Sequence, residues 1–134
     1  MQPKANKEKG KPMTTTETLT KAELANFTGS ETWYRHALVR DVLFTDGAKH
    51  VADAGGAYWL LGEIALAQRY KKKVAAEEFQ VWTLKVKNDR TAKLTCEDGN
   101  GNAVYAKRIT FTDFPLDEIS FYFCNHTILL PSEY

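Results

Sequence analysis

The sequence predicts an α+β fold, in which an antiparallel sheet of about four to six strands carries two to three helices packed on one face. Two observations predict it. Segments with helical periodicity dominate residues 20–70, and alternating segments separated by turn signals follow them. The chain has 134 residues, of which 43% are hydrophobic and 26% are charged. This is enough for one domain whose core needs neither a disulfide nor a metal.

The chain is expected to consist of a tail and one domain. Residues 1–18 contain lysines, prolines and threonines but few apolar side chains, so they are predicted to be a disordered basic tail. Residues 19–134 are predicted to form a single α+β domain. Neither a signal peptide nor a membrane span is expected, because no segment is apolar over sufficient length. We therefore expect a cytoplasmic protein with Cys96 and Cys124 reduced.

The first predicted helix has a clear start signal. Thr20 and Glu23 have the spacing of a capping box, which predicts a short helix from Lys21 to about Phe27. One or two short strands are expected between Glu31 and Phe44, where the alternation of apolar and polar residues is irregular. Their residues predicted to be buried are Trp33, Tyr34, Leu38, Val39, Val42, Leu43 and Phe44.

Glycines mark the borders of the next two helices. Thr45-Asp46-Gly47 is predicted to cap one helix, and Gly55-Gly56 to form the corner before another, from about Ala57 to Tyr70. A phosphate-binding loop is the alternative interpretation of these glycines. Such a loop follows a strand and precedes a Lys-Ser/Thr pair, and this segment does neither, so we favour a helix corner.

The second half of the chain predicts a meander of strands. Alternation indicates strands over residues 79–87 and 92–97, then over 103–111 after the hairpin signal Asp98-Gly99-Asn100-Gly101-Asn102. A last hairpin is expected from residues 119–124 and 127–130, across Asn125-His126. The residues predicted to face the core are Trp82, Leu84, Val86, Ala92, Leu94, Cys96, Tyr105, Ile109 and Phe111.

A polar stripe on the helix after Thr45 is the first candidate site. At about 100° per residue, Asp46, His50 and Asp53 share one helix face, together with Lys49. Carboxylates and imidazole bind metal ions, but the Lys49 charge would oppose a cation. The stripe is also typical of a solvated helix face, which we favour over a metal site.

A thiol and an imidazole form the second candidate site. Cys124 and His126 are two residues apart, but the sequence shows no third group that would orient them for nucleophilic catalysis. Zinc binding by these two residues and Cys96 would lack the usual paired ligand spacing. A metal- or thiol-dependent enzyme is therefore the least favoured hypothesis, and no cofactor is expected.

The helix from about Ala57 to Tyr70 is apolar on two sides. One stripe is expected to face the core and consists of Ala57, Leu60, Leu61, Ile64 and Ala67. The second stripe is either covered within the fold or presented to a partner protein or a second copy of the chain. It consists of Trp59, Glu63, Leu66 and Tyr70.

Basic residues support an alternative hypothesis, nucleic-acid binding. The run Lys71–Lys73 follows the helix at its C-terminus, where the helix dipole favours cations. Further cations are predicted on the outer face of the sheet, namely Lys85, Lys87, Lys93 and Arg108. Base stacking needs exposed rings, and most aromatic residues are expected to face inward. The net charge of +1 also gives no general attraction to a polyanion.

Several segments resemble a known family. They are TDGAKHVADAGGAYWLL (45–61), EEFQVWTLKV (77–86), DGNGN (98–102), TDFP (112–115) and LLPSEY (129–134). With them the chain, from about Thr20 onward, resembles an uncharacterised bacterial or mobile-element family of unknown function. The resemblance implies a small single-domain protein and brings no catalytic residue. We therefore expect a non-enzymatic interaction or regulatory protein, possible roles being an accessory or host-directed factor of a mobile element.

Overall fold

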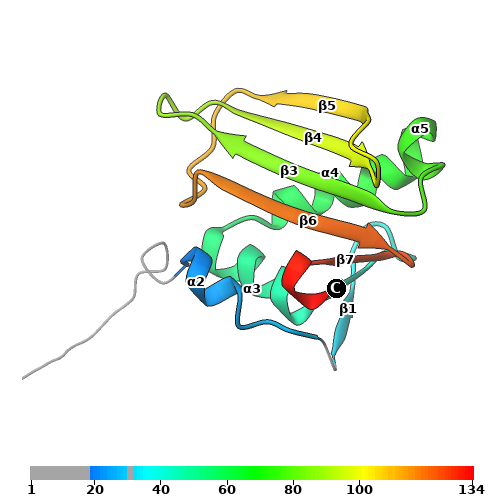
Figure 1. The fold of residues 1–134 in the computed structure, drawn as a ribbon, viewed down its shortest axis with the longest axis horizontal. Helices are drawn as coiled ribbons and strands as arrows, with labels where there is room; N and C mark the ends of the chain where they lie inside the picture. Colours follow the sequence, from blue (N-terminus) through cyan, green and yellow to red (C-terminus); the bar gives the residue numbers. More distant parts are fainter. Residues whose placement is uncertain (1–18, 30–31) are drawn as a thin grey trace, which may run out of the picture.

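The computed structural model describes residues 19–29 and 32–134, so the predicted tail lies outside the described residues. The described part of the chain contains four α-helices and one seven-stranded sheet, which confirms the α+β class (Figure 1). The helices are α2 (Lys21–Leu24), α3 (Asp46–Gly55), α4 (Tyr58–Tyr70) and α5 (Lys72–Ala75), with a 3₁₀ helix η1 (Pro131–Glu133). The strands are β1 (Trp33–Arg35), β2 (Leu43–Thr45), β3 (Gln80–Val86), β4 (Ala92–Asp98), β5 (Ala103–Ile109), β6 (Glu118–Cys124) and β7 (Thr127–Leu129).

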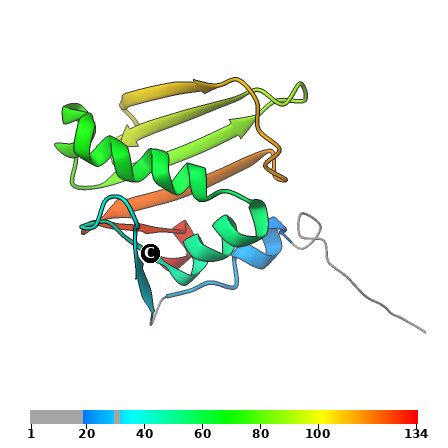
Figure 2. The same ribbon diagram turned by 180° about the vertical axis from the view of Figure 1, so that it is seen from behind.

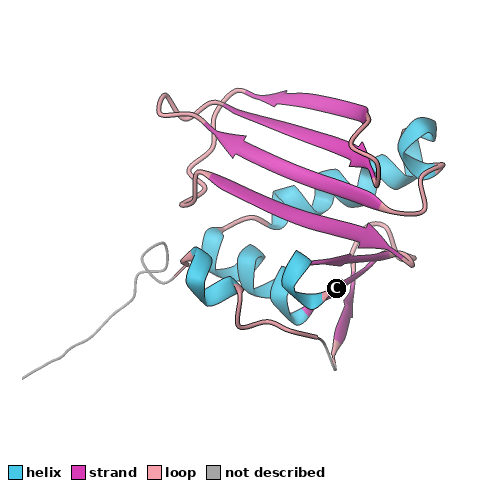
Figure 3. Cartoon of the chain, viewed as in Figure 1, coloured by secondary structure: helices cyan, strands magenta, loops and turns pink. Residues whose placement is uncertain are grey.

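The sheet has the order β1-β2-β7-β6-β3-β4-β5 and is antiparallel except where β2 pairs with β7 (Figure 3). The expected four to six strands and two to three helices are each one too few. Strands β1 and β2 lie where one or two short strands were expected, although β2 ends at Thr45 and not at Phe44. Helix α5 is a single turn after Lys71, and its sequence KKVA is too short to show the apolar periodicity that predicts a helix.

Helices cover one face of the sheet. Helix α4 crosses this face over β3 and β6, in front of them in Figure 2, and α3 packs beside β1, β2 and β7. The register places Trp82 between Phe121 and Cys96, and all three are buried. Leu84 lies in the same way between Ile119 and Leu94. The alternation predicted for β3 and β4 is therefore confirmed, and these side chains form the core beneath the helices.

Three residues expected in the core are exposed. Trp33 lies on the edge strand β1, and Leu38 lies in the loop before β2. Phe111 follows the end of β5 at Ile109, so the alternation of that strand no longer applies to it. Its place in the core is taken by Phe114, which is fully buried.

The TDFP segment is held by side chain to backbone hydrogen bonds. The Thr112 hydroxyl accepts from the Phe114 amide at 3.1 Å. Arg90, at the β3–β4 turn, donates to the carbonyls of Thr112 and Phe114 at 3.0 and 2.6 Å. The Phe114 ring packs against Gly55 of α3, where an added Cβ would lie 2.8 Å from a ring carbon. The segment therefore locks α3 to the β3–β4 end of the sheet.

The predicted helix signals are confirmed. Thr20 and Glu23 form the capping box, with backbone to side-chain distances of 3.2 and 3.1 Å, although α2 ends at Leu24 and not at about Phe27. Thr45 caps α3 through the Ala48 amide. Gly56 ends α3 with a φ of 62°, a left-handed conformation that favours glycine.

A buried carboxylate joins the C-terminal segment to the start of α3. Glu133 accepts hydrogen bonds from the Thr45 hydroxyl at 2.6 Å, the Gly47 amide at 3.1 Å and the Leu130 amide at 2.8 Å. It thus supplies negative charge to the N-terminus of α3, which the helix dipole favours. No local sequence pattern predicts this role, because Glu133 is far from Thr45 and Gly47 along the chain.

A buried amide joins α4, α5 and the sheet. Gln80 is fully buried and exchanges hydrogen bonds with the Gln68 amide of α4 at 2.7 and 2.9 Å. It also donates to the carbonyls of Val74 and Glu77, and its oxygen accepts from the Trp82 indole at 2.8 Å. This network satisfies polar groups that would otherwise be buried without partners.

Candidate functional site

The polar stripe of α3 is occupied by internal interactions. Lys49 pairs with Asp53 at 2.7 Å, and the Tyr58 hydroxyl also donates to Asp53. Burial opposes ionisation of Asp53, but these hydrogen bonds lower its pKa below the ordinary value. The Tyr34 hydroxyl donates to Asp46 at 3.0 Å, and this bond raises the pKa of Tyr34. The stripe therefore forms a polar network between α3, β1 and the start of α4.

A metal site on this stripe gains no support from the geometry. His50 lies 3.3 Å from the Glu23 carboxylate of α2, and Lys49 pairs with Asp53. Among residues 19–29 and 32–134, no three side chains of metal-binding type come together. The stripe borders a shallow pocket together with the segment 26–29. It serves to hold α2 and β1 against α3.

The two thiols lie in different surroundings, and neither is activated. Cys96 is fully buried beneath the helices, and burial raises its pKa to about 12. Cys124 is half-buried beside Trp33, and burial raises its pKa as well. His126 lines a separate pocket with Asp41 and Glu77. A nucleophilic thiol requires a lowered pKa, so the environment of Cys124 opposes that role.

Both thiols are expected to react slowly with an aromatic disulfide reagent in the native protein at about pH 8, with Cys96 the slower. The thiolate is the reacting form, and a raised pKa lowers its fraction at this pH. The measurement is the time course of thiol release, with the protein in denaturant as the control in which both react fast. Rapid reaction of Cys124 in the native protein would contradict the assignment.

The second stripe of α4 is only partly covered. Trp59 is half-buried against the core, whereas Leu66 is 38% exposed and Tyr70 is 69% exposed. Glu63 pairs with Lys107 of β5 at 2.8 Å. The stripe therefore divides into a half that packs within the fold and a half that remains open.

The open half of the stripe lies beside β5. Lys71 places its ammonium 5.7 Å from the centre of the Tyr105 ring, and the Glu63–Lys107 pair ties the helix to the strand. A groove runs between the two elements. It is lined by Glu63, Leu66, Ala67, Tyr70, Lys71, Tyr105, Ala106 and Lys107.

Strand β5 is one edge of the sheet. It pairs with β4 only, and it is seven residues long, whereas the other edge strand, β1, has three residues. In an antiparallel edge strand, about every second residue turns its N–H and C=O to the open side. The groove therefore lies beside a row of backbone groups that another strand can pair with. We name the surface formed by β5, Leu66 and Tyr70 the α4–β5 edge.

The predicted basic residues fall into two groups. Lys71 faces Tyr105, which is opposite Cys96 and so lies on the helix-covered side of the sheet. Lys72 and Lys73 are exposed on α5. The outer face of the sheet carries the other group, in which Lys85, Lys93 and Arg108 are opposite one another and Lys87 follows the end of β3.

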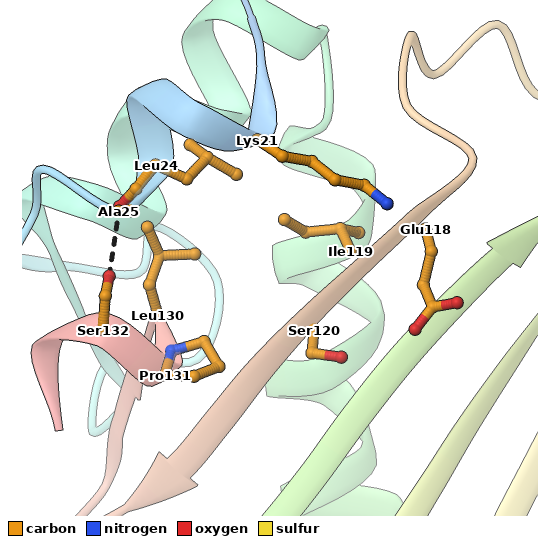
Figure 4. A pocket seen from close by; sticks show the side chains of 9 residues that line it. All are labelled: Lys21, Leu24, Ala25, Glu118, Ile119, Ser120, Leu130, Pro131 and Ser132. Atoms are coloured by element: carbon orange, nitrogen blue, oxygen red, sulfur yellow. Dashed lines mark hydrogen bonds between the residues drawn. The ribbon is translucent and has the colours of Figure 1, made fainter.

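A further groove lies where α2 meets the sheet (Figure 4). Lys21 and Glu118 stand on one side of it, and Leu24, Leu130 and Pro131 form the apolar side. The Ser132 hydroxyl donates to the Leu24 carbonyl at 3.1 Å. This groove marks the contact of α2 with the C-terminal segment.

These features define a small α+β protein with helices on one sheet face and a partly open groove at one sheet edge. Residues 18–134 match the model of a family of unknown function, DUF6876, and the chain belongs to this family. Comparison with curated proteins and with solved structures gave no match. Among the described residues, no helix is long and apolar enough to cross a membrane.

Proposed function

We propose that this chain is a non-enzymatic protein-interaction module whose partner docks on the α4–β5 edge. The observation that carries the proposal is that Leu66 and Tyr70 are exposed directly beside the open side of β5. A partner strand that paired with β5 would satisfy its backbone groups and cover both side chains. Tyrosine is also enriched among the residues that dominate binding energy at interfaces.

The charges along this edge control its pairing. Lys107 and Arg108 lie on β5, and charged side chains on an edge strand discourage indiscriminate association with other strands. The Glu63–Lys107 pair neutralises one of these charges and fixes α4 against the strand. The edge is thus protected against aggregation but remains accessible to a partner with matching side chains.

A photo-crosslinking amino acid placed at Tyr70 tests the site. We expect it to capture a protein, either a second copy or another chain, when the full-length protein is expressed in its source cells. The same amino acid at Leu38, in the loop before β2, is a matched control. Leu38 is also 69% exposed but does not line the groove beside β5. Equal capture at both positions, or no capture at Tyr70, would refute the proposal.

Replacing Leu66 and Tyr70 with serine is expected to weaken binding of the captured partner at least about tenfold, because interface anchors each contribute more than about 1 kcal/mol. The melting temperature should change little, since both side chains are exposed in the free protein. Calorimetric titration of the purified partner measures the affinity. Leu38→Ser is the control, and an unchanged affinity in the double variant would count against this surface.

We further propose a cytoplasmic location and an accessory or host-directed role in a mobile element. Free thiols at Cys96 and Cys124 fit a reducing compartment. The accessory role rests only on the resemblance described above. Fractionation of the source cells tests the location, and the genes next to this one test the role. Recovery outside the cytoplasm, or neighbours unrelated to mobile elements, would refute these two points.

A further inference from the structure

The outer face of β3, β4 and β5 is open. Figure 1 looks onto this face, and none of the helices in the described part of the chain crosses the three strands on that side, whereas α4 lies on the opposite face. Side chains here come from the alternate positions of the strands whose other positions form the core. The face is distinct from the α4–β5 groove, which lies on the helix side.

Three cations form a row across this face. The register places Lys85 opposite Lys93 and Lys93 opposite Arg108, so their side chains are neighbours on three adjacent strands. Residues opposite one another have Cβ atoms about 5 Å apart. Glu118 is opposite Lys85 from the β6 side, and Glu97, four residues from Lys93, lies on the same face opposite Val81. Within residues 19–29 and 32–134, the ion pairs involve Lys49, His50 and Lys107 and none of these three cations. We call Lys85, Lys93 and Arg108 the cationic row.

The cationic row is expected to lower the stability of the free protein slightly. Like charges that are directly opposite in a sheet repel each other, and Glu118 is opposite only Lys85 among the three cations. An anion bound across the row would offset this repulsion. The three cations that would bind an anion are therefore also expected to lower the stability of the free protein.

Aromatic rings lie on the same face at its other end. Tyr122 is opposite Val81, which is four residues from Lys85, a distance of about 13 Å along an extended strand. Its ring lies 4.9 Å from the Phe79 ring and 5.5 Å from the Tyr134 ring. Tyr134 is 75% exposed. The hydroxyls of Thr83 and Ser120, 3.2 Å apart, lie between the rings and the row.

We propose that this face binds single-stranded nucleic acid, with phosphates on the cationic row and a base against Tyr134. Phosphate contacts supply the attraction, and stacking on an exposed ring requires an unpaired base. An acidic peptide would use the row but has no bases to stack on the aromatic rings. Since the whole chain carries a net charge of only +1, the attraction is local to the row.

The test uses the full chain and a fluorescent oligothymidine of about ten nucleotides, a length typical of one such face. Anisotropy at low salt is expected to show binding that weakens as salt is raised. In the Lys93→Gln/Arg108→Gln variant the dissociation constant should rise roughly tenfold or more, and the salt slope should fall by about 1.4, which is about 0.7 per lost cation. Tyr134→Ser should also weaken binding.

The matched control is Lys72→Gln/Lys73→Gln, which removes the same charge from α5. At about 0.1 M salt, where the Debye length is about 10 Å, it should change the dissociation constant by less than about twofold. A second readout separates binding from folding. The Lys93→Gln/Arg108→Gln variant should melt about 1–3 °C higher than the unsubstituted chain, because the repulsion is relieved. Cations with a structural role would give a lower melting temperature.

Four results would overturn the inference. They are no binding by the unsubstituted chain at low salt, undiminished binding by the Lys93→Gln/Arg108→Gln variant, a duplex bound as tightly as the single strand, and displacement of the oligonucleotide by polyglutamate at equal charge concentration. The last result would assign the row to an acidic protein. Crosslinking at Tyr70 is independent of each of them, so this inference and the proposed function can fail separately.

Discussion

Replacing Glu133 with alanine is expected to lower the free energy of unfolding by about 2–4 kcal/mol, one of the two largest effects we predict. The carboxylate accepts from the Thr45 hydroxyl and from the amides of Gly47 and Leu130. Its loss leaves buried donors without a partner, at about 1–3 kcal/mol for each unsatisfied group. The contact also joins the C-terminal segment to the N-terminus of α3, so the variant loses a link between distant parts of the chain.

Urea denaturation followed by circular dichroism measures this effect. Glu78→Ala is the matched control, because Glu78 is exposed, and its substitution should change the free energy of unfolding by less than about 0.5 kcal/mol. Glu133→Gln keeps an acceptor oxygen and should fall between the two. A Glu133→Ala variant as stable as the control would show that the contact contributes no net stability.

Replacing Gln80 with leucine is expected to cost about 2–4 kcal/mol although the new side chain is apolar and similar in size. The substitution removes the partner of the Gln68 amide, of the Trp82 indole and of two backbone carbonyls. Polar groups buried without hydrogen bonds oppose folding. Hydrophobicity alone would predict a higher free energy of unfolding for this variant, so urea denaturation distinguishes the two expectations.

A double-mutant cycle with Gln68 isolates the network. Gln68→Leu alone removes the amide pair and leaves Gln80 partly unsatisfied, while the double variant removes both partners. The double variant should therefore be more stable than the sum of the single effects implies, by about 0.5–3 kcal/mol. Simple additivity would mean that the two amides do not act as a unit.

The candidate surfaces show what the periodicity of the sequence can and cannot predict. It grouped Trp59, Glu63, Leu66 and Tyr70 on one side of α4, because the angle between helix residues is set locally, and the last three line the groove beside β5. It could not tell which of them stay open, since that depends on β5 lying beside the helix and on Lys107 reaching Glu63. Likewise, alternation placed Lys85, Lys93 and Arg108 on the outer face, but only the strand register made them direct neighbours.

The missed features share a physical origin. One or two short strands were expected between Glu31 and Phe44 but not their partners, since β1 and β2 are defined by their pairing with each other and with β7. Phe114 is buried although no regular element contains it, because Arg90 and Thr112 fold its loop onto Gly55. The buried Gln80 was not expected either, since its acceptors and donors come from α4 and the segment after it.

The sequence by itself determined the α+β class, the caps of α2 and α3, the Gly56 corner and the inward faces of β3 and β4. All of these depend on hydrogen bonds and side-chain directions within a few residues. Only the tertiary structure decided the sheet order, the Glu133 contact to α3, the half-open stripe beside β5 and the cationic row. These depend on which distant segments pack together, and the free energy of that packing is spread over many contacts that no local pattern records.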